Sequence, residues 1–168
     1  RAERILREIQ TRVGKLSRVE VDLANDERAT LEEFEVKMRQ LITRTMAQYE
    51  PSYWRHLNPD FAGRVEQRVQ QWLRSNPGRS KKEIDPLDFC QIRDYLKVIR
   101  SQWTHFEPIF ASRSELEKHL DNISDFRNAV MHSREIGRST RKLAEGSLIW
   151  FADIFSSHSA EDRVRGES

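Results

Sequence analysis

The sequence holds a single cysteine, and glycine and proline are scarce, with six and five residues among 168. One cysteine excludes a disulfide within the chain and suits a reducing compartment. No apolar run approaches the ~20 residues that a bilayer crossing needs, and no signal-peptide pattern opens the chain. We therefore expect a cytoplasmic protein without a membrane segment.

Motifs for metal and nucleotide chemistry are also missing. The histidines are scattered, no His-Glu-x-x-His or Cys/His cluster occurs, and there is no glycine-rich phosphate loop. Nothing points to a serine or cysteine triad. Acidic and basic residues nearly cancel, with a formal net charge of +2, so charge alone does not indicate nucleic acid. The sequence predicts no metal site and no cofactor.

Apolar residues recur at helical spacing along most of the chain. From Arg1 to about Asn25 they step by three and four: Ile5, Ile9, Val13, Leu16, Val19 and Leu23. Two interpretations of this amphipathic helix stay open: it packs on its own domain, or it is a coiled-coil-like arm that reaches a partner or the preceding part of a longer protein. The chain begins with arginine instead of methionine, which fits a fragment of something longer.

Start signals for further helices follow. They lie at Thr30, Asn58–Pro59, Asp85–Pro86, Ser112 and just after the turn around Gly137. The stripe after Asp85–Pro86 predicts one long helix to Phe106, which Pro108 breaks. The sum is an all-α, up-and-down bundle of five or six helices. We expect the N-terminal helix over 1–27, the bundle over 28–156, and a polar, disordered tail over 157–168.

Three Arg…His pairs share a spacing of four to six intervening residues: Arg100…His105, Arg113…His119 and Arg127…His132. Context favours the third, which falls at a helix end just before a turn, with apolar neighbours that fasten the backbone to the core. Residues five apart lie about 140° around a helix, so Arg127 and His132 cannot share one face of a straight helix. Either the helix ends or distorts between them, or a second molecule completes the site.

The segment Phe-Arg-Asn-Ala-Val-Met-His, residues 126–132, resembles the Arg-x4–6-His motif of the HEPN superfamily. The layout from about Leu31 to Phe155 is similar to the Swt-type and related bacterial branches. The resemblance implies a helical bundle that dimerises and places two such motifs across one cleft. Many members are metal-independent endoribonucleases of defence, toxin or RNA-processing systems, and others are non-catalytic RNA-binding or interaction modules.

The chemistry of these side chains fits metal-free RNA cleavage. Histidine can act as general base or acid near neutral pH, and arginine can clamp a phosphate. Two copies of His132 would provide both proton transfers and leave a 2′,3′-cyclic phosphate and a 5′-hydroxyl. Asn128 would orient His132 or bind the phosphate, and Asp125 would hold Arg127. In the alternative, Arg127 forms a salt bridge to a neighbouring helix and His132 caps a helix C-terminus.

Other basic residues are candidate RNA contacts. Arg134 follows the motif closely, and Arg79, Lys81 and Lys82 lie on a loop with proline and glycine. Most charge runs of this kind are only solvated surface, so the loop gains value only if it lies near the motif.

Overall fold

Six α-helices and three short 3₁₀ turns form the part of the chain that the computed structural model describes, residues 2–132 and 135–166. Side chains are described for residues 26–132 and 135–159, and for Arg7, Gln10 and Thr11. The helices are α1 (Ala2–Tyr49), α2 (Pro59–Ser75), α3 (Ile92–Ser101), α4 (Trp103–Phe110), α5 (Arg113–Met131) and α6 (Arg138–Gly166); the turns are η1 (Tyr53–His56), η2 (Lys81–Glu83) and η3 (Pro86–Phe89). These described residues contain no strand, which confirms the predicted all-α class.

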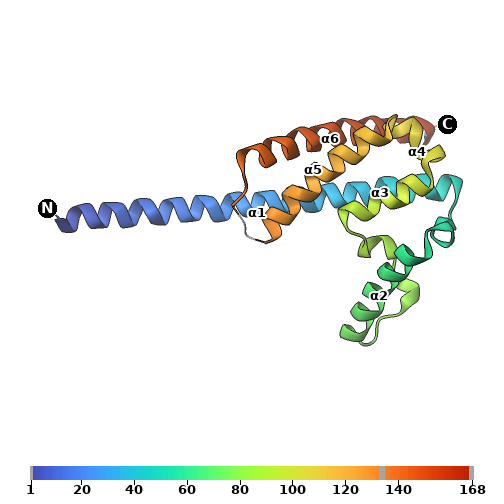
Figure 1. Ribbon diagram of the computed structural model, residues 1–168, viewed down its shortest axis with the longest axis horizontal. Helices are drawn as coiled ribbons and strands as arrows, with labels where there is room; N and C mark the ends of the chain where they lie inside the picture. The colour runs from blue at the N-terminus through green and yellow to red at the C-terminus, as the bar shows by residue number, and fades with distance from the viewer. Residues whose placement is uncertain (1, 133–134, 167–168) are drawn as a thin grey trace.

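The longest element, α1, runs through the bundle and continues beyond it at its N-terminal end (Figure 1). The predicted helix start at Thr30 is wrong, because α1 passes through this position without a break. The Thr30 hydroxyl donates to the Asp26 carbonyl oxygen at 2.9 Å, one turn back, instead of capping a new helix. No glycine or proline lies between residues 15 and 50, so nothing local interrupts the helix.

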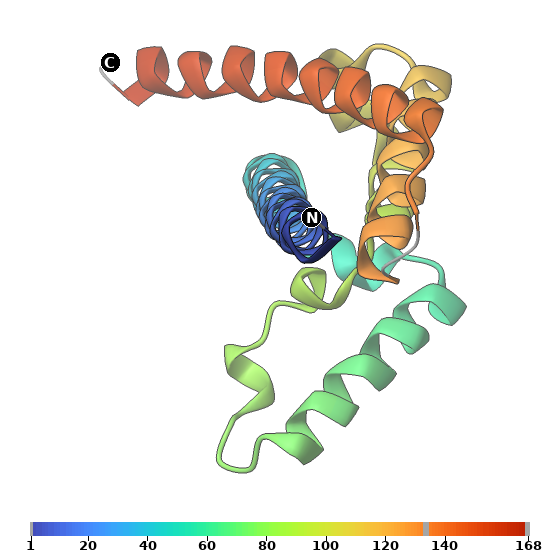
Figure 2. The ribbon, with the colours of Figure 1, turned by 90° about the vertical axis from the view of Figure 1, so that its left-hand side faces the viewer.

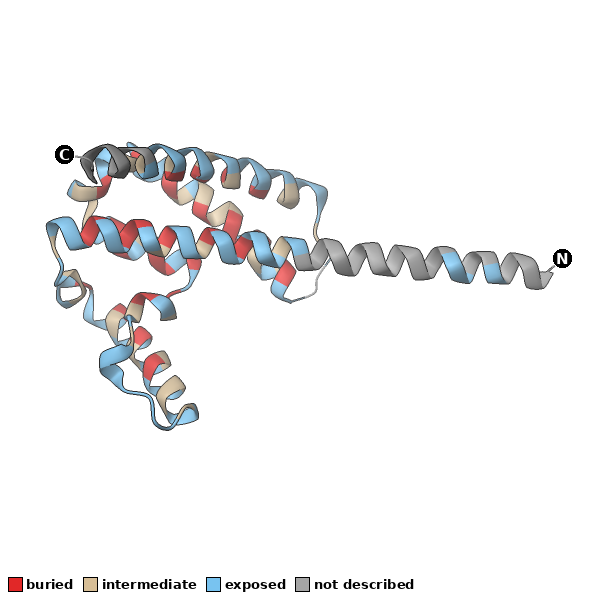
Figure 3. Ribbon diagram, turned by 180° about the vertical axis from the view of Figure 1, so that it is seen from behind, coloured by how far each residue is buried: buried red, intermediate tan, exposed pale blue. Residues whose placement is uncertain are grey.

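The core forms where α1, α3, α5 and α6 meet (Figures 2 and 3). The apolar residues that recur at helical spacing in α1 from Leu31 to Met46 are buried, as are Tyr95 and Ile99 of α3. On α1 the core residues are Leu31, Phe34, Met38, Leu41, Ile42 and Met46, and α5 adds Leu116, Leu120, Ile123 and Phe126. Burial of this size is the main source of stability in a helical domain.

The segment that the sequence predicts as one helix from Asp85 to Phe106 is divided into η3, α3 and α4. Asp85 caps only a short turn, with its carboxylate accepting from the Leu87 backbone N–H at 3.0 Å. A new N-terminus then forms because the Asp94 carboxylate accepts from the Gln91 backbone N–H at 2.8 Å. Pro108 lies inside α4 and does not end it there.

Three start signals are confirmed: α6 begins at Arg138, just after Gly137, and two other helices begin at side-chain caps. Asn58 accepts from the backbone N–H groups of Asp60 and Phe61, and Ser112 accepts from that of Glu115. At the C-terminal end the structure differs from the expectation of a tail that begins at residue 157, since α6 continues to Gly166. Leu143, a large apolar residue of this helix, is exposed.

Candidate functional site

The structure separates the three Arg…His pairs by what each histidine contacts. Arg100 lies on α3 and forms an ion pair with Glu117 of α5 at 3.6 Å. His105 lies on α4, beyond the break at Gln102, and its ring stacks on Tyr49 at 4.6 Å between centroids. These two residues therefore belong to different helices and have packing roles.

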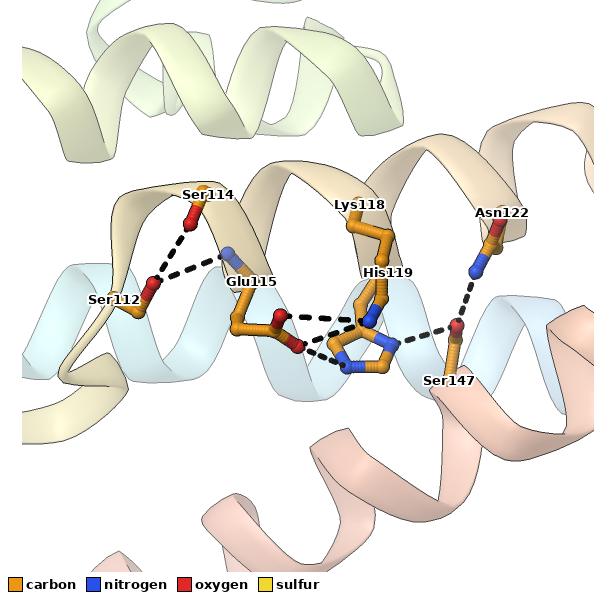
Figure 4. A network of polar contacts seen from close by, with 7 residues as sticks. All are labelled: Ser112, Ser114, Glu115, Lys118, His119, Asn122 and Ser147. Carbon is orange, nitrogen blue, oxygen red and sulfur yellow. Dashed lines mark hydrogen bonds and ion pairs between the residues drawn. The ribbon is translucent and has the colours of Figure 1, made fainter.

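The second pair is also built into the packing. The Arg113 guanidinium lies over the Trp103 ring at 5.2 Å, and His119 stacks on Trp150 of α6 at 4.4 Å between centroids. Figure 4 shows the polar contacts of His119: Nδ1 is 2.8 Å from Ser147 Oγ, and Nε2 is 3.5 Å from the Glu115 carboxylate. This network fixes α5 against α6.

Glu115, His119 and Ser147 follow the order of a carboxylate–histidine–serine triad, but the serine is inaccessible. Ser147 is 1% exposed, and its hydroxyl oxygen also accepts from Asn122 Nδ2 at 3.0 Å. The hydroxyl proton is thus left to donate to His119 Nδ1, which places the imidazole proton on Nε2, toward Glu115. These residues satisfy one another inside the helix interface, and we assign them a structural role.

This network predicts a loss of stability on the acid side of neutrality. Burial lowers the pKa of His119 below its ordinary value of 6.5. Between that value and the lowered one the unfolded chain binds more protons, so this contribution is complete above pH 6.5 and is lost as pH falls through the folded-state pKa. When the pH is lowered from 7 to 5, the free energy of unfolding in urea is expected to fall less for the His119→Gln chain than for the unmodified chain.

The matched control is His56→Gln, because the His56 side chain is 60% exposed. It should keep the full pH dependence. Equal pH dependence in the His119→Gln chain and the unmodified chain would contradict the role given to His119.

The third pair lies at the C-terminal end of α5, as the sequence predicts. α5 ends at Met131 and His132 is its C-cap residue, but the His132 backbone N–H still donates to the Asn128 carbonyl oxygen at 3.1 Å, so the helix is regular from Arg127 to its last residue. The two residues therefore lie on different faces of α5, whereas Asn128 and His132 lie one turn apart on a shared, exposed face. Among the described residues, the His132 side chain has no hydrogen-bond, ion-pair or ring partner.

Arg127 is half-buried and faces α1. Burial raises the pKa of Glu35, and the positive charges of Arg127 and Arg39 partly offset this effect. Arg39 in turn donates to the Tyr95 hydroxyl at 3.1 Å, and burial raises the pKa of Tyr95 to about 12. Arg127 is therefore close enough to Glu35 of α1 to be attracted by its charge, on a different face of α5 from His132.

Asp125 and the predicted basic loop have other surroundings than the sequence suggests. The Asp125 carboxylate lies 3.4 Å from Arg93 Nη2 of α3, so Arg93, not Arg127, is its partner. Lys81 contacts Glu66 at 2.5 Å, and Figures 1 and 2 place the loop with Arg79, Lys81 and Lys82 at the free tip of α2, away from the end of α5. Arg134 lies outside the described residues.

Sequence reasoning missed a group of cations beside the motif. Arg138 and Lys142 are exposed at the start of α6, and Arg28 is exposed where α1 leaves the bundle. Arg141 binds Glu27, which joins the start of α6 to α1. The missed signal was the basic run Arg138, Arg141 and Lys142, which follows the candidate Arg134 in the sequence after His132.

Residues for other kinds of chemistry do not gather in the described part of the chain. No three His, Cys, Asp or Glu residues there form a group that could hold a metal ion. Burial raises the pKa of Cys90 to about 12, which disfavours the reactive thiolate. None of the described helices combines the length and apolar character of a bilayer-crossing segment.

No family model, curated protein or solved structure matches this chain.

Proposed function

We propose that this chain is a HEPN-like, metal-independent endoribonuclease domain whose active site is completed by a second copy. Arg127 and His132 are the essential residues, and Asn128 supports them. The substrate is RNA, which is cut by attack of its own 2′-hydroxyl on the neighbouring phosphate. A defence, toxin or RNA-processing system is the expected setting.

One observation carries the proposal: of the three histidines with a suitably spaced arginine, His132 alone has a side chain without a partner among the described residues. Its imidazole is exposed at a helix end, beside the exposed side chain of Asn128. A general acid or base must be accessible to substrate and free of competing hydrogen bonds. His105 and His119 do not meet these requirements, because both are held in packing contacts.

The regular geometry of α5 supports the requirement for a second copy. Since α5 is helical from Arg127 to Met131 and His132 caps it at the next position, a phosphate beside His132 of one chain is on the wrong face for the Arg127 of that chain. A symmetric dimer supplies two histidines, one as base and one as acid, and two arginines.

The electrostatics at this end of the bundle also favour an anionic ligand. Arg28, Arg138 and Lys142 are exposed there, and the N-terminus of α6 adds the positive end of a long helix. Such charges attract a phosphate backbone without selecting a base sequence.

A non-catalytic RNA-binding or interaction module is the second candidate, and the position of Arg127 favours it. The proximity of Arg127 to Glu35, half-buried against α1, is also what a purely structural arginine would show. In that case the exposed end of α5 would be a binding surface only.

The test is cleavage of a labelled, mixed-sequence single-stranded RNA in EDTA. The ribonuclease proposal predicts products with 2′,3′-cyclic phosphate and 5′-hydroxyl ends, and their loss in the His132→Ala chain. Binding of the same RNA without cleavage by the unmodified chain would instead favour the module.

A further inference from the structure

The part of α1 that extends past the bundle has a seven-residue repeat. One heptad position is apolar throughout, with Ile9, Leu16 and Leu23, and the second position of the seam holds Ile5, Arg12 and Val19. Because residues 2–25 are helical in the structure, these positions form one stripe along α1. None of the other helices that the structure describes lies beside that part of α1 (Figure 1). Isolated helices are marginal in water, so such a stripe calls for a partner.

We propose that residues 2–26 of α1, here called the arm, form a parallel two-stranded coiled coil with the arm of a second copy. This inference rests on the proposed function only where it concerns the active site. The dimer itself follows from the continuous helix and from the repeat.

Charge distinguishes the parallel arrangement from the antiparallel one. In a parallel pair, Lys15 of each arm lies opposite Glu20 of the partner, so two attractive pairs form across the seam. In a fully overlapped antiparallel pair, Lys15 would lie opposite Lys15, and Glu8 opposite Asp22, so that all of these contacts would be repulsive. The flanking charges thus favour parallel, in-register arms.

Arg12 is the one charged residue within the stripe, and in the parallel pair it lies opposite Arg12 of the other copy. A single polar residue in the seam of a coiled coil lowers its stability and fixes its register. An arginine can place its guanidinium outside the seam while its aliphatic stem stays inside it. Glu8 precedes Arg12 by one helical turn, which is the favourable order for an ion pair within one helix. The cost of Arg12 is therefore confined to one layer between the apolar layers of Ile9 and Leu16.

The parallel pair contains one pair of like charges beside the seam, and an ion pair within each chain reduces this repulsion. Asp22 would lie opposite Glu27 of the other copy, but Glu27 is bound by Arg141 of its own α6. The apolar repeat also stops here, since the next two positions are occupied by Asp26 and Thr30. The coiled coil would therefore end where α1 enters the bundle.

A parallel coiled coil has a consequence for the proposed active site. α1 enters the bundle at the end where α5 stops and α6 begins (Figure 1). Two helices of a coiled coil pack about 10 Å apart. Parallel arms would therefore bring both α5 ends, with both copies of His132, to the root of one coiled coil.

Cysteine cross-linking tests the register. Leu16→Cys lies on the stripe and pairs with itself only in a parallel, in-register dimer, whereas Arg18→Cys lies outside it. The native Cys90 is buried and serves as the background in the unmodified chain. Under mild oxidation, the Leu16→Cys chain is expected to form a covalent dimer at least about tenfold faster than the Arg18→Cys chain. Equal rates would overturn the proposed register.

Light scattering tests whether the arm makes the dimer. The unmodified chain should have twice the monomer mass, and Leu16→Glu with Leu23→Glu should reduce it to the monomer mass. The matched control is Ser17→Glu with Ala24→Glu, which adds the same charge one position further along and should remain dimeric. A monomeric unmodified chain, or a dimeric Leu16→Glu/Leu23→Glu chain, would refute the proposal.

These readouts are independent of catalysis. A chain that dimerises through the arm but leaves RNA intact would refute only the ribonuclease. A monomeric chain that cuts RNA would refute the arm and the shared active site, but not the ribonuclease activity.

Discussion

Cleavage of RNA in EDTA by the His132→Ala chain is expected to be at least about 100-fold slower than by the unmodified chain, because a positioned general acid or base contributes this much or more. His132 is exposed and its side chain has no hydrogen-bond, ion-pair or ring partner among the described residues, so the substitution should leave the fold intact. His56→Ala is the matched control, since His56 is another exposed histidine in a 3₁₀ turn. A folded His132→Ala chain that cleaves at the unmodified rate would exclude His132 from the reaction.

Arg127 needs a control that separates chemistry from stability. Arg127→Ala removes a positive charge beside the half-buried Glu35, so a loss of activity could arise from a disturbed fold. Arg127→Lys keeps that charge but loses the planar fork that clamps two phosphate oxygens. We expect near-normal unfolding by urea for Arg127→Lys, and cleavage reduced by about 10- to 100-fold. Arg100→Ala, on exposed α3 surface, should leave cleavage unchanged.

Mixing the unmodified and His132→Ala chains tests whether both histidines act in one site. After exchange of subunits at equal concentrations, about a quarter of the dimers contain two intact chains. The cleavage rate is compared with that of the unmodified chain at the same total protein concentration. It should fall to about a quarter if both histidines are required, and to about a half if each chain works alone.

The features that the sequence predicted correctly are those with local causes. Asn58 and Ser112 cap helices through backbone N–H groups two or three residues away, so their short motifs suffice. The stripe from Leu31 to Met46 is buried as its spacing predicts. The position of His132 at a helix end also followed from the local pattern of apolar residues and turn signals.

The features that the sequence could not predict depend on partners distant in the chain. Thr30 begins a good capping motif, but the residues on both sides of it can all be helical. α1 therefore continues through Thr30, and the motif does not start a new helix. Asp125 precedes Arg127 by two residues, yet Arg93 of α3 is the cation that reaches it. His119 belongs to an Arg…His pair that sequence context did not favour, and it is part of the interface with α6. Only packing decides such cases.

Asp94 is the clearest example of a residue whose role appears only in the structure, and its loss should have a large effect on stability. Its side chain is 8% exposed, and it accepts from Arg68 Nη1 and the Gln91 backbone N–H, both at 2.8 Å. Arg68 also donates to the Phe89 carbonyl oxygen at 2.9 Å. These bonds begin α3 and attach α2 to it.

Asp94→Ala is expected to lower the free energy of unfolding in urea by about 3 kcal/mol, because it removes both a buried ion pair and a helix cap. This figure is at the lower end for a buried pair, since the Arg68 side chain is one-third exposed. Asp94→Asn keeps an oxygen for the Gln91 N–H but loses the charge, so it should fall between Asp94→Ala and the unmodified chain.

The control for Asp94 is Asp88→Ala, because Asp88 pairs with Arg39 at 3.4 Å but is 62% exposed. It should change the free energy of unfolding by less than about 0.5 kcal/mol. If Asp94→Ala were as mild as Asp88→Ala, the contacts at Asp94 would not hold α2 to α3. A large loss with Asp94→Ala and a small one with Asp94→Asn would show that the cap, more than the charge of Arg68, determines the start of α3.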